Sequence, residues 1–194
     1  DIEGVFSASW SPLGNEIAYV GQSGNSSDIY IFDLNTQTSK KITNDIFSDS
    51  YPTWSGDGKN IAFVSDRGNE ISGAYDGFMY EHDYSQTDIY FVNVETKKID
   101  RVTNTNHNES HPVWSKTSDN IFYTSDHNGV WNLYRHPLSG SEDSEPIPVT
   151  NVLTGLQQPT ISGDDRLLIF AGYSGIGWDL YSMANPLTLK KQTV

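Results

Sequence analysis

Short apolar runs alternate with polar turn residues along the whole chain, and no window of the sequence sustains helical periodicity. The runs are rich in Ile, Val, Phe, Tyr and Thr, and clusters of Gly, Asn, Asp and Ser interrupt them, which is typical of β-strands joined by tight turns. In the first part of the chain this pattern predicts four strands, at residues 7–10, 16–20, 28–34 and 39–43. The chain is therefore expected to be all-β.

The four-strand pattern recurs four times, with Trp10, Trp54, Trp114 and Ile161 as equivalent anchors. An aliphatic residue follows each anchor after seven residues: Ile17, Ile61, Ile121 and Leu168. A tyrosine follows three anchors after 20 residues (Tyr30, Tyr134 and Tyr181), but in the second copy Tyr90 follows after 36. The second copy thus carries a 16-residue insertion, within GNEISGAYDGFMYEHDYSQTDIY.

Four antiparallel strands that repeat about every 44 residues predict the blades of a β-propeller, because a small twisted sheet buries both faces only by stacking on neighbours. The expected blades span residues 5–44, 51–104 with the insertion at 70–85, 111–151 and 158–194. A β-sandwich also has short strands, but it would not repeat its turn chemistry at fixed offsets. The fold class expected is a β-propeller of four-stranded antiparallel blades, with four blades in a single domain over residues 1–194.

The repeat carries the pattern W-S-x-D-G-x-x-I-A-F, then S-D-R-G, D-I-Y and an aliphatic residue followed by Thr, and YPTWSGDGKNIAFVSDRG is its most specific copy. This pattern resembles the repeats of TolB-type propellers, and related repeats occur in the propeller domains of the prolyl-oligopeptidase family. The later copies depart from it: KTSD follows Trp114-Ser115, and Ile161 replaces Trp. Since such families have six or more blades, the resemblance implies a partial propeller, and a closed four-bladed ring is the alternative.

The charge balance argues against nucleic acid as a partner. The net charge is −13, from 25 acidic and 12 basic residues, and the lysine pairs are isolated rather than gathered in a basic patch. Anionic membrane surfaces are disfavoured for the same reason, and no apolar stretch is long enough to insert in a membrane. The absence of Cys excludes disulfides and thiolate chemistry but does not identify the compartment. A periplasmic or otherwise extracytoplasmic location is implied by the family resemblance alone.

Motifs for self-contained catalysis are absent from the sequence, which has no G-x-S-x-G, H-E-x-x-H or phosphate-binding Gly-Lys motif. His107 and His111 are four residues apart, but they lie in the loop sequence NTNHNESHP rather than on a helix, so a metal site there is disfavoured. We therefore expect no enzymatic activity from this chain by itself.

The conspicuous repeated residues have structural interpretations. The tryptophan anchors are expected to fill the space between blades. Asp28, Asp88 and Asp179, with Asn132 in the third copy, stand at equivalent strand starts and are expected to accept hydrogen bonds from turn N–H groups.

Candidate binding residues lie on one face of the predicted blades. Tyr51, His111 and Gln158 each precede Pro at the same repeat position and are expected to surround the mouth of the central channel. The insertion joins the second and third strands of its blade, so it shares this face. Its aromatic and histidine residues, which are further candidates, are Tyr75, Phe78, Tyr80, His82 and Tyr84. No cofactor is expected, apart from the weak hypothesis of a divalent cation such as calcium at Asp76, Glu81 and Asp83.

Three functions remain open. The leading hypothesis is a non-catalytic, TolB-like scaffold of the bacterial cell envelope that binds a protein or peptide on the insertion face. The first alternative is the substrate-gating propeller of a prolyl-oligopeptidase-like serine hydrolase whose catalytic domain lies elsewhere, and the second is a carbohydrate-binding or polyuronate lyase propeller. Exposed edges of the terminal blades would also permit self-association.

Overall fold

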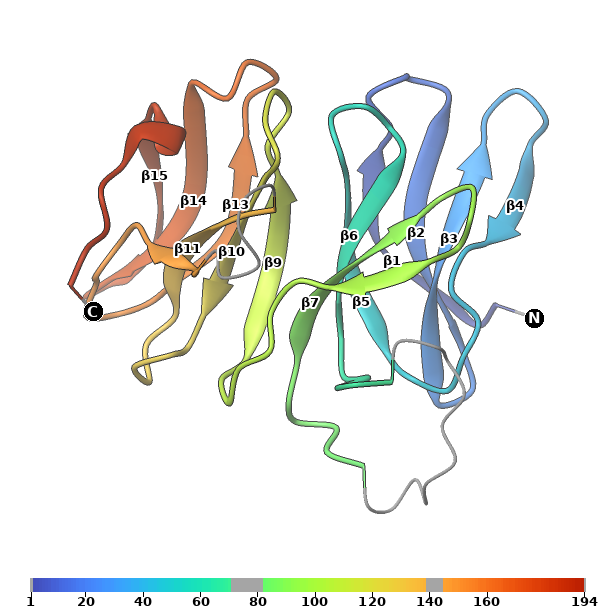
Figure 1. The fold of residues 1–194 in the computed structure, drawn as a ribbon, viewed down its shortest axis with the longest axis horizontal. Helices are drawn as coiled ribbons and strands as arrows, with labels where there is room; N and C mark the ends of the chain where they lie inside the picture. The colour runs from blue at the N-terminus through green and yellow to red at the C-terminus, as the bar shows by residue number, and fades with distance from the viewer. Residues whose placement is uncertain (1, 71–81, 139–144, 194) are drawn as a thin grey trace. The chain divides into compact units, whose positions relative to one another are not determined.

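The computed structural model describes residues 2–70, 82–138 and 145–193 (Figure 1). The chain divides into two compact units, an N-terminal unit (Asp1–Asn106) and a C-terminal unit (His107–Val194). None of the described residues belongs to a helix that is long and apolar enough to cross a membrane. The only helical turn among them is the 3₁₀ segment η2 (Pro186–Thr188).

The N-terminal unit contains two antiparallel sheets in which each strand pairs with the next one along the chain. The strands of the first sheet are β1 (Gly4–Trp10), β2 (Glu16–Ser23), β3 (Ser26–Asp33) and β4 (Thr38–Lys41). The strands of the second sheet are β5 (Asp49–Trp54), β6 (Asn60–Ser65), β7 (Asp88–Asn93) and β8 (Ile99–Arg101). This meander order is that of a propeller blade, and the insertion lies between β6 and β7 as expected.

The C-terminal unit contains a four-stranded sheet and a three-stranded sheet. The first is formed by β9 (Glu109–Trp114), β10 (Asn120–Ser125), β11 (Asn132–Pro137) and β12 (Ile147–Pro148). The second is formed by β13 (Leu156–Ile161), β14 (Leu167–Ser174) and β15 (Gly177–Ala184). The predicted all-β architecture of successive antiparallel blades is confirmed.

The segment after β15 departs from the repeat pattern. The four-strand repeat predicts an outer strand for the fourth blade, but among the described residues no strand after β15 pairs with it. Instead, Leu187 and Leu189 pack against the apolar core that the third and fourth blades share, and the N–H of Gln192 donates to the carbonyl of Pro148 at 2.9 Å. Partial burial of the two leucines in this core favours the observed position of the segment.

Apolar residues of consecutive blades form one core in each unit. In the N-terminal unit, Trp54 is fully buried among residues of β2, β3 and β6, and its Nε1–H donates to the carbonyl of Ser9 at 3.2 Å. In the C-terminal unit, Ile161 packs at the equivalent position against a core that the third and fourth blades share. The expectation that the tryptophan anchors fill the space between blades is confirmed for Trp54, but it is wrong for Trp10, whose side chain is 64% exposed.

A recurring side-chain clasp ties the third strand of each of the first three blades to the loop that leaves the blade. Its members are an Asp or Asn at the start of the third strand and a Thr after the fourth: Asp28 with Thr43, Asp88 with Thr103 and Asn132 with Thr150. Each Thr hydroxyl also accepts a backbone N–H of the third strand, at 2.8–2.9 Å. The expectation that the residue at this position accepts hydrogen bonds from backbone N–H groups is confirmed for Asp28, Asp88 and Asn132.

The carboxylate or amide of each clasp also fixes the beginning of the next interblade loop. Asp28 accepts the N–H of Asp45 at 3.3 Å, and Asn132 accepts that of Val152 at 2.9 Å. Burial raises the pKa of Asp28 even though the Lys41 ammonium, at 2.7 Å, acts to lower it. The fourth blade lacks the clasp, because Asp179 instead accepts the hydroxyl of Ser174 at 2.6 Å.

Another residue, Asp165, compensates for the decayed turn of the third copy. It occupies the position of Gly58 in the W-S-x-D-G turn and has a left-handed φ of 55°. Its carboxylate accepts the N–H groups of Lys116 and Thr117, both at 2.8 Å, and the hydroxyl of Ser115 at 2.7 Å. Burial would raise the pKa of Asp165, but these hydrogen bonds hold it below its ordinary value. The fourth blade thus supplies the polar partners that the KTSD turn lacks.

We predict that Asp165→Asn lowers the free energy of unfolding by about 1.5–3 kcal/mol at neutral pH, the range for hydrogen bonds to a charged group. Asn tolerates a left-handed φ, so the substitution removes the charge without adding backbone strain. Because the folded-state pKa is lowered, the stabilisation is present above the unfolded pKa and is lost as the pH falls through the folded one. Urea unfolding measures the difference.

The control is Asp164→Asn, since Asp164 is exposed and bonds only within its own turn. Equal losses in the two variants would contradict the role of Asp165 between the blades.

Candidate functional site

A left-handed residue interrupts the first strand of every blade at the same repeat position. The four residues are Ser7, Tyr51, His111 and Gln158, with φ between 47° and 52°. In each case the register with the second strand shifts around this residue, which marks a β-bulge. Left-handed backbone costs roughly 1–2 kcal/mol for a residue with a Cβ, so its recurrence points to a use. Bulges of this kind redirect a side chain away from the regular pleat.

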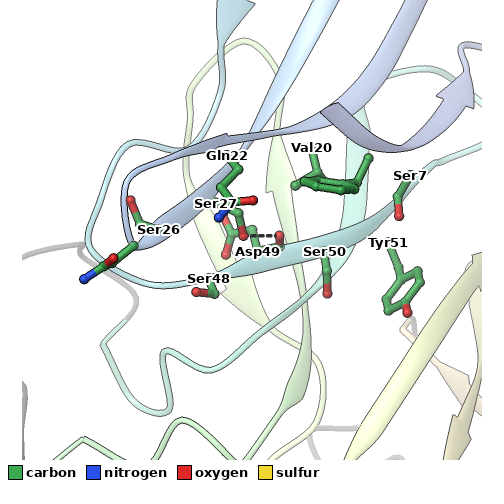
Figure 2. A pocket seen from close by; sticks show the side chains of 11 residues that line it. Ser7, Val20, Gln22, Ser26, Ser27, Ser48, Asp49, Ser50 and Tyr51 are labelled. Carbon is green, nitrogen blue, oxygen red and sulfur yellow. Dashed lines mark hydrogen bonds between the residues drawn. The ribbon is translucent and has the colours of Figure 1, made fainter. Parts of the chain in front are cut away.

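In the N-terminal unit, two of these residues line a pocket of about 500 Å³, the serine pocket (Figure 2). Its lining residues are Phe6, Ser7, Val20, Gln22, Asn25, Ser26, Ser27, Ser48, Asp49, Ser50 and Tyr51. Figure 2 shows Ser7 and Tyr51 at one end of the pocket and Ser26 at the other. Ser27 is held in place because its hydroxyl donates to the carbonyl of Asp49 at 2.8 Å. Hydroxyl and amide groups therefore dominate a concave surface that also carries two aromatic rings.

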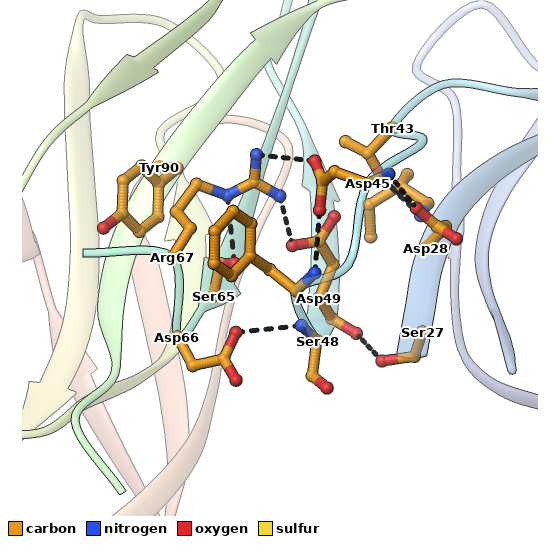
Figure 3. A network of polar contacts seen from close by, with 12 residues as sticks. Ser27, Asp28, Thr43, Asp45, Ser48, Asp49, Ser65, Asp66, Arg67 and Tyr90 are labelled. Carbon is orange, nitrogen blue, oxygen red and sulfur yellow. Dashed lines mark hydrogen bonds and ion pairs between the residues drawn. The ribbon is translucent and has the colours of Figure 1, made fainter. Parts of the chain in front are cut away.

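A buried ion cluster under the serine pocket holds the interblade loop (Figure 3). The guanidinium of Arg67 donates to Asp45 at 3.0 Å, to Asp49 at 2.6 Å and to the hydroxyl of Ser65 at 3.0 Å. Arg67 is only 1% exposed. The rings of Phe47, Phe63 and Tyr90 lie around it, with centroids 5.2–5.7 Å from its guanidinium carbon. The R of the S-D-R-G motif thus joins β6 of the second blade to the loop that arrives from the first.

The same cluster perturbs the ionisation of Asp49. Burial raises its pKa to about 6, although the charge of Arg67 acts to lower it. Two carboxylates share one guanidinium, so the network depends on that single cation.

We predict that Arg67→Met lowers the free energy of unfolding by about 3–5 kcal/mol at pH 8, because two buried carboxylates lose their cation. The loss should be smaller at pH 5. Without Arg67 the folded-state pKa of Asp49 rises further above its unfolded value, and the stability gained by protonation is present at low pH and lost as the pH rises through the folded pKa. Urea titrations at the two pH values test this.

Arg166→Met is the matched control, since Arg166 is exposed and its pairing with the exposed Asp164, at 3.7 Å, is screened by solvent. If Arg67→Met loses the same free energy of unfolding at pH 5 and at pH 8, the two unpaired carboxylates are not the cause of its lower stability.

The end of the insertion contacts this cluster. The imidazole of His82 lies 3.4 Å from the carboxylate of Asp66, and its ring centroid is 5.3 Å from that of Phe47. Asp66 in turn accepts the N–H of Ser48 at 2.9 Å, and Ser48 lines the serine pocket. Tyr84 lies edge-on against His82 and is 58% exposed. The insertion is therefore connected to the pocket through two side-chain contacts.

The remaining insertion candidates are not tested. Tyr75, Phe78, Tyr80, Asp76 and Glu81 lie outside the described residues. Asp83 is described, and its Oδ1 accepts the N–H and the hydroxyl of Ser85 at 3.0 and 2.6 Å, so it closes a local turn. These two hydrogen bonds lower the pKa of Asp83. Within the described part of the chain, no group of three or more His, Asp or Glu residues could hold a metal ion. The cation hypothesis stays a prediction.

In the C-terminal unit, His111 lines a second pocket of about 430 Å³, the tryptophan pocket. Its lining residues are Ser110, His111, Thr124, Trp131, Thr154, Gly155, Leu156, Gln157 and Trp178. Burial lowers the pKa of His111, which favours the neutral imidazole. Gln158 is exposed at its equivalent left-handed position but does not line this pocket.

Sequence reasoning missed several members of these sites. Ser7 was overlooked because Ala8 rather than Pro follows it, although it precedes Trp10 by three residues as Tyr51 precedes Trp54. Trp131 and Trp178 both stand 17 residues after their anchors, so the spacing alone marks them as equivalent positions of the repeat. The burial of Arg67 has no such signal, since a basic residue in a turn motif is usually solvated.

These features define a module of β-propeller blades that presents pockets on one face of each unit. Relatives support this class. TolB of Francisella tularensis, a protein of the Tol-Pal system, is 29% identical over 171 residues, which is 88% of this chain and 35% of the relative. Dipeptidyl-peptidase 5 of Porphyromonas gingivalis is 29% identical over 145 residues, 70% of this chain and 20% of the peptidase. No protein-family model matches the chain.

Solved structures show the same fold. TolB from Acinetobacter baumannii superimposes with a TM-score of 0.73 over 96% of this chain and 42% of that protein, at 21% identity. A puromycin hydrolase gives 0.70 over 99% of this chain and 28% of the hydrolase, at 11% identity. The resemblance to TolB-type propellers, and to the propellers of related peptidases, is confirmed. The chain spans about a third of the length of the TolB relatives, 35%.

Proposed function

We propose that this chain is a non-catalytic, TolB-like binding module that recognises a protein or peptide of the bacterial cell envelope. The observation that carries the proposal is the recurring left-handed bulge. It presents Ser7, Tyr51, His111 and Gln158 from one repeated backbone geometry. A shared backbone with different side chains is what a recognition surface requires, whereas a purely structural position would keep one residue type.

The serine pocket and the end of the insertion supply the second part of the argument. The pocket offers hydroxyl and amide groups that suit the polar groups of a peptide, and Tyr51, at 40% exposure, offers an aromatic anchor. His82 and Tyr84 bring the insertion to the same interblade loop. The extracytoplasmic location and the envelope partner follow from similarity to TolB and belong to this proposal.

We predict that Tyr51→Ala weakens partner binding by at least about tenfold, the effect of losing an interfacial aromatic anchor. A photo-crosslinking residue at position 50 of the full-length protein identifies the partner in cells, and calorimetry with the purified partner gives the affinities. Deletion of residues 72–86 should weaken binding as well.

Glu95→Ala is the control, because Glu95 is exposed in the β7–β8 turn, at the other end of the strands. The proposal fails if Tyr51→Ala and the deletion both bind the partner with the affinity of the unmodified protein.

A second candidate function is favoured by the similarity to dipeptidyl-peptidase 5 and to the propeller of a puromycin hydrolase. In that case the chain is the substrate-gating propeller of a serine hydrolase. A fluorophosphonate probe, which labels activated serines, distinguishes the two functions. Labelling of the full-length protein supports the hydrolase, and its absence together with partner binding supports the scaffold.

A further inference from the structure

The serine and tryptophan pockets are related by the repeat. Each lies between two consecutive blades and is lined by the left-handed residue of the first blade, by its neighbour and by the interblade loop. His111 corresponds to Ser7, and Trp131 corresponds to Ser27, since both pairs stand at equal distances from their anchors. The scaffold therefore forms a cavity at an equivalent place in both units, with a different lining in each.

The indoles of the tryptophan pocket are not needed to fill the scaffold. The position 17 residues after the anchor holds Ser27 in the first blade and, once the insertion is subtracted, Thr87 in the second. In the last two blades the same position holds Trp131 and Trp178, and both indoles line the pocket. Because a small hydroxyl residue suffices at this position elsewhere, two large aromatic rings here require another explanation.

One contact fixes the backbone of Trp131, and another fixes the ring of Trp178. The carbonyl of Trp131 accepts the N–H of Leu156 at 2.8 Å, so the strand of the next blade fixes its backbone. Trp178 packs edge-on against Tyr173, with centroids 5.5 Å apart and an angle of 72° between the rings. Gly155 also lines the pocket, and its φ of +101° disfavours a residue with a side chain at this position. The pocket is therefore pre-organised rather than collapsed.

Polar groups accompany the indoles, and none of the lining residues carries a carboxylate, an ammonium or a guanidinium. The structure gives the hydroxyl of Ser110 and the amide of Gln157 no side-chain hydrogen bond to the described part of the chain, so both can serve a ligand. The hydroxyl of Thr124 donates to the carbonyl of Ser110 at 3.1 Å and keeps its acceptor lone pairs.

We propose that the tryptophan pocket is a binding site for an uncharged sugar ring. A pyranose has apolar C–H faces that can stack on the two indoles, and a rim of hydroxyls that can exchange hydrogen bonds with Ser110, Thr124 and Gln157. The volume of about 430 Å³ is within the range of small-ligand sites. An apolar peptide side chain would cover the indoles but would form no hydrogen bonds with these polar groups. A uronate would need a cation that the lining lacks.

The test uses the full-length protein and five probes: cellobiose, lactose and N,N′-diacetylchitobiose as uncharged sugars, digalacturonate as the charged one, and a proline-rich peptide. Tryptophan fluorescence and calorimetry measure binding. We expect at least one uncharged sugar to bind, and Trp131→Ala and Trp178→Ala each to weaken it by about tenfold. Trp131→Phe, which keeps a ring, should restore most of the affinity, and Gln157→Ala should weaken binding without a large change in stability.

Leu153→Ala is the matched control, since Leu153 is 92% exposed in the adjacent loop and does not line the pocket. The proposal is overturned if no uncharged sugar binds, if only digalacturonate or the peptide binds, or if sugar binding is the same in all the pocket variants and the control. The site shares no lining residue with the serine pocket, so its failure would leave the proposed function standing, and the reverse also holds.

Discussion

In the first three blades, the clasp between the third strand and the threonine after the fourth strand is the interaction on which the rest of the blade depends. One side-chain oxygen of Asp28, Asp88 or Asn132 accepts hydrogen bonds from the Thr hydroxyl and from a backbone N–H of the departing loop. The Thr hydroxyl in turn accepts a backbone N–H of the third strand. Burial makes an unsatisfied partner costly, so the loop has a defined start. Because the loop leads directly into the next bulged strand, the clasp also sets where the left-handed residue lies.

The two units show how one scaffold supports different chemistry. In the N-terminal unit the interblade loop is held by the charge of Arg67, and its pocket is lined mainly by hydroxyl groups. In the C-terminal unit the pocket is lined by two indoles and an imidazole. There the two blades are joined by the hydrogen bonds of Asp165 to the preceding turn as well as by the apolar core. The backbone pattern is retained while the lining changes, so specificity resides in a few positions rather than in the fold.

Much of the fold could be predicted from the sequence, because the spacing between Trp54 and Ile61, repeated in every copy, reports a local hairpin. The outer strand of the fourth blade could not, since its place depends on whether Leu187 and Leu189 gain more from the neighbouring core than from pairing. Tyr51, His111 and Gln158 could be recognised as equivalent positions because each precedes Pro, but their left-handed backbone was not predicted. The burial of Arg67 and the meeting of Trp131 with Trp178 depend on contacts between segments far apart in sequence, which local patterns do not encode.

The bulge that carries Tyr51 has a consequence for the evolution of binding specificity in such a protein. Its side chain leaves the pleat and is 40% exposed, so a substitution there disturbs little of the blade core and alters mainly what the surface recognises. The four positions already hold four different residue types, Ser7, Tyr51, His111 and Gln158, in the same left-handed backbone conformation. Single substitutions at these four positions can therefore change what the surface binds while the stability of the scaffold is preserved.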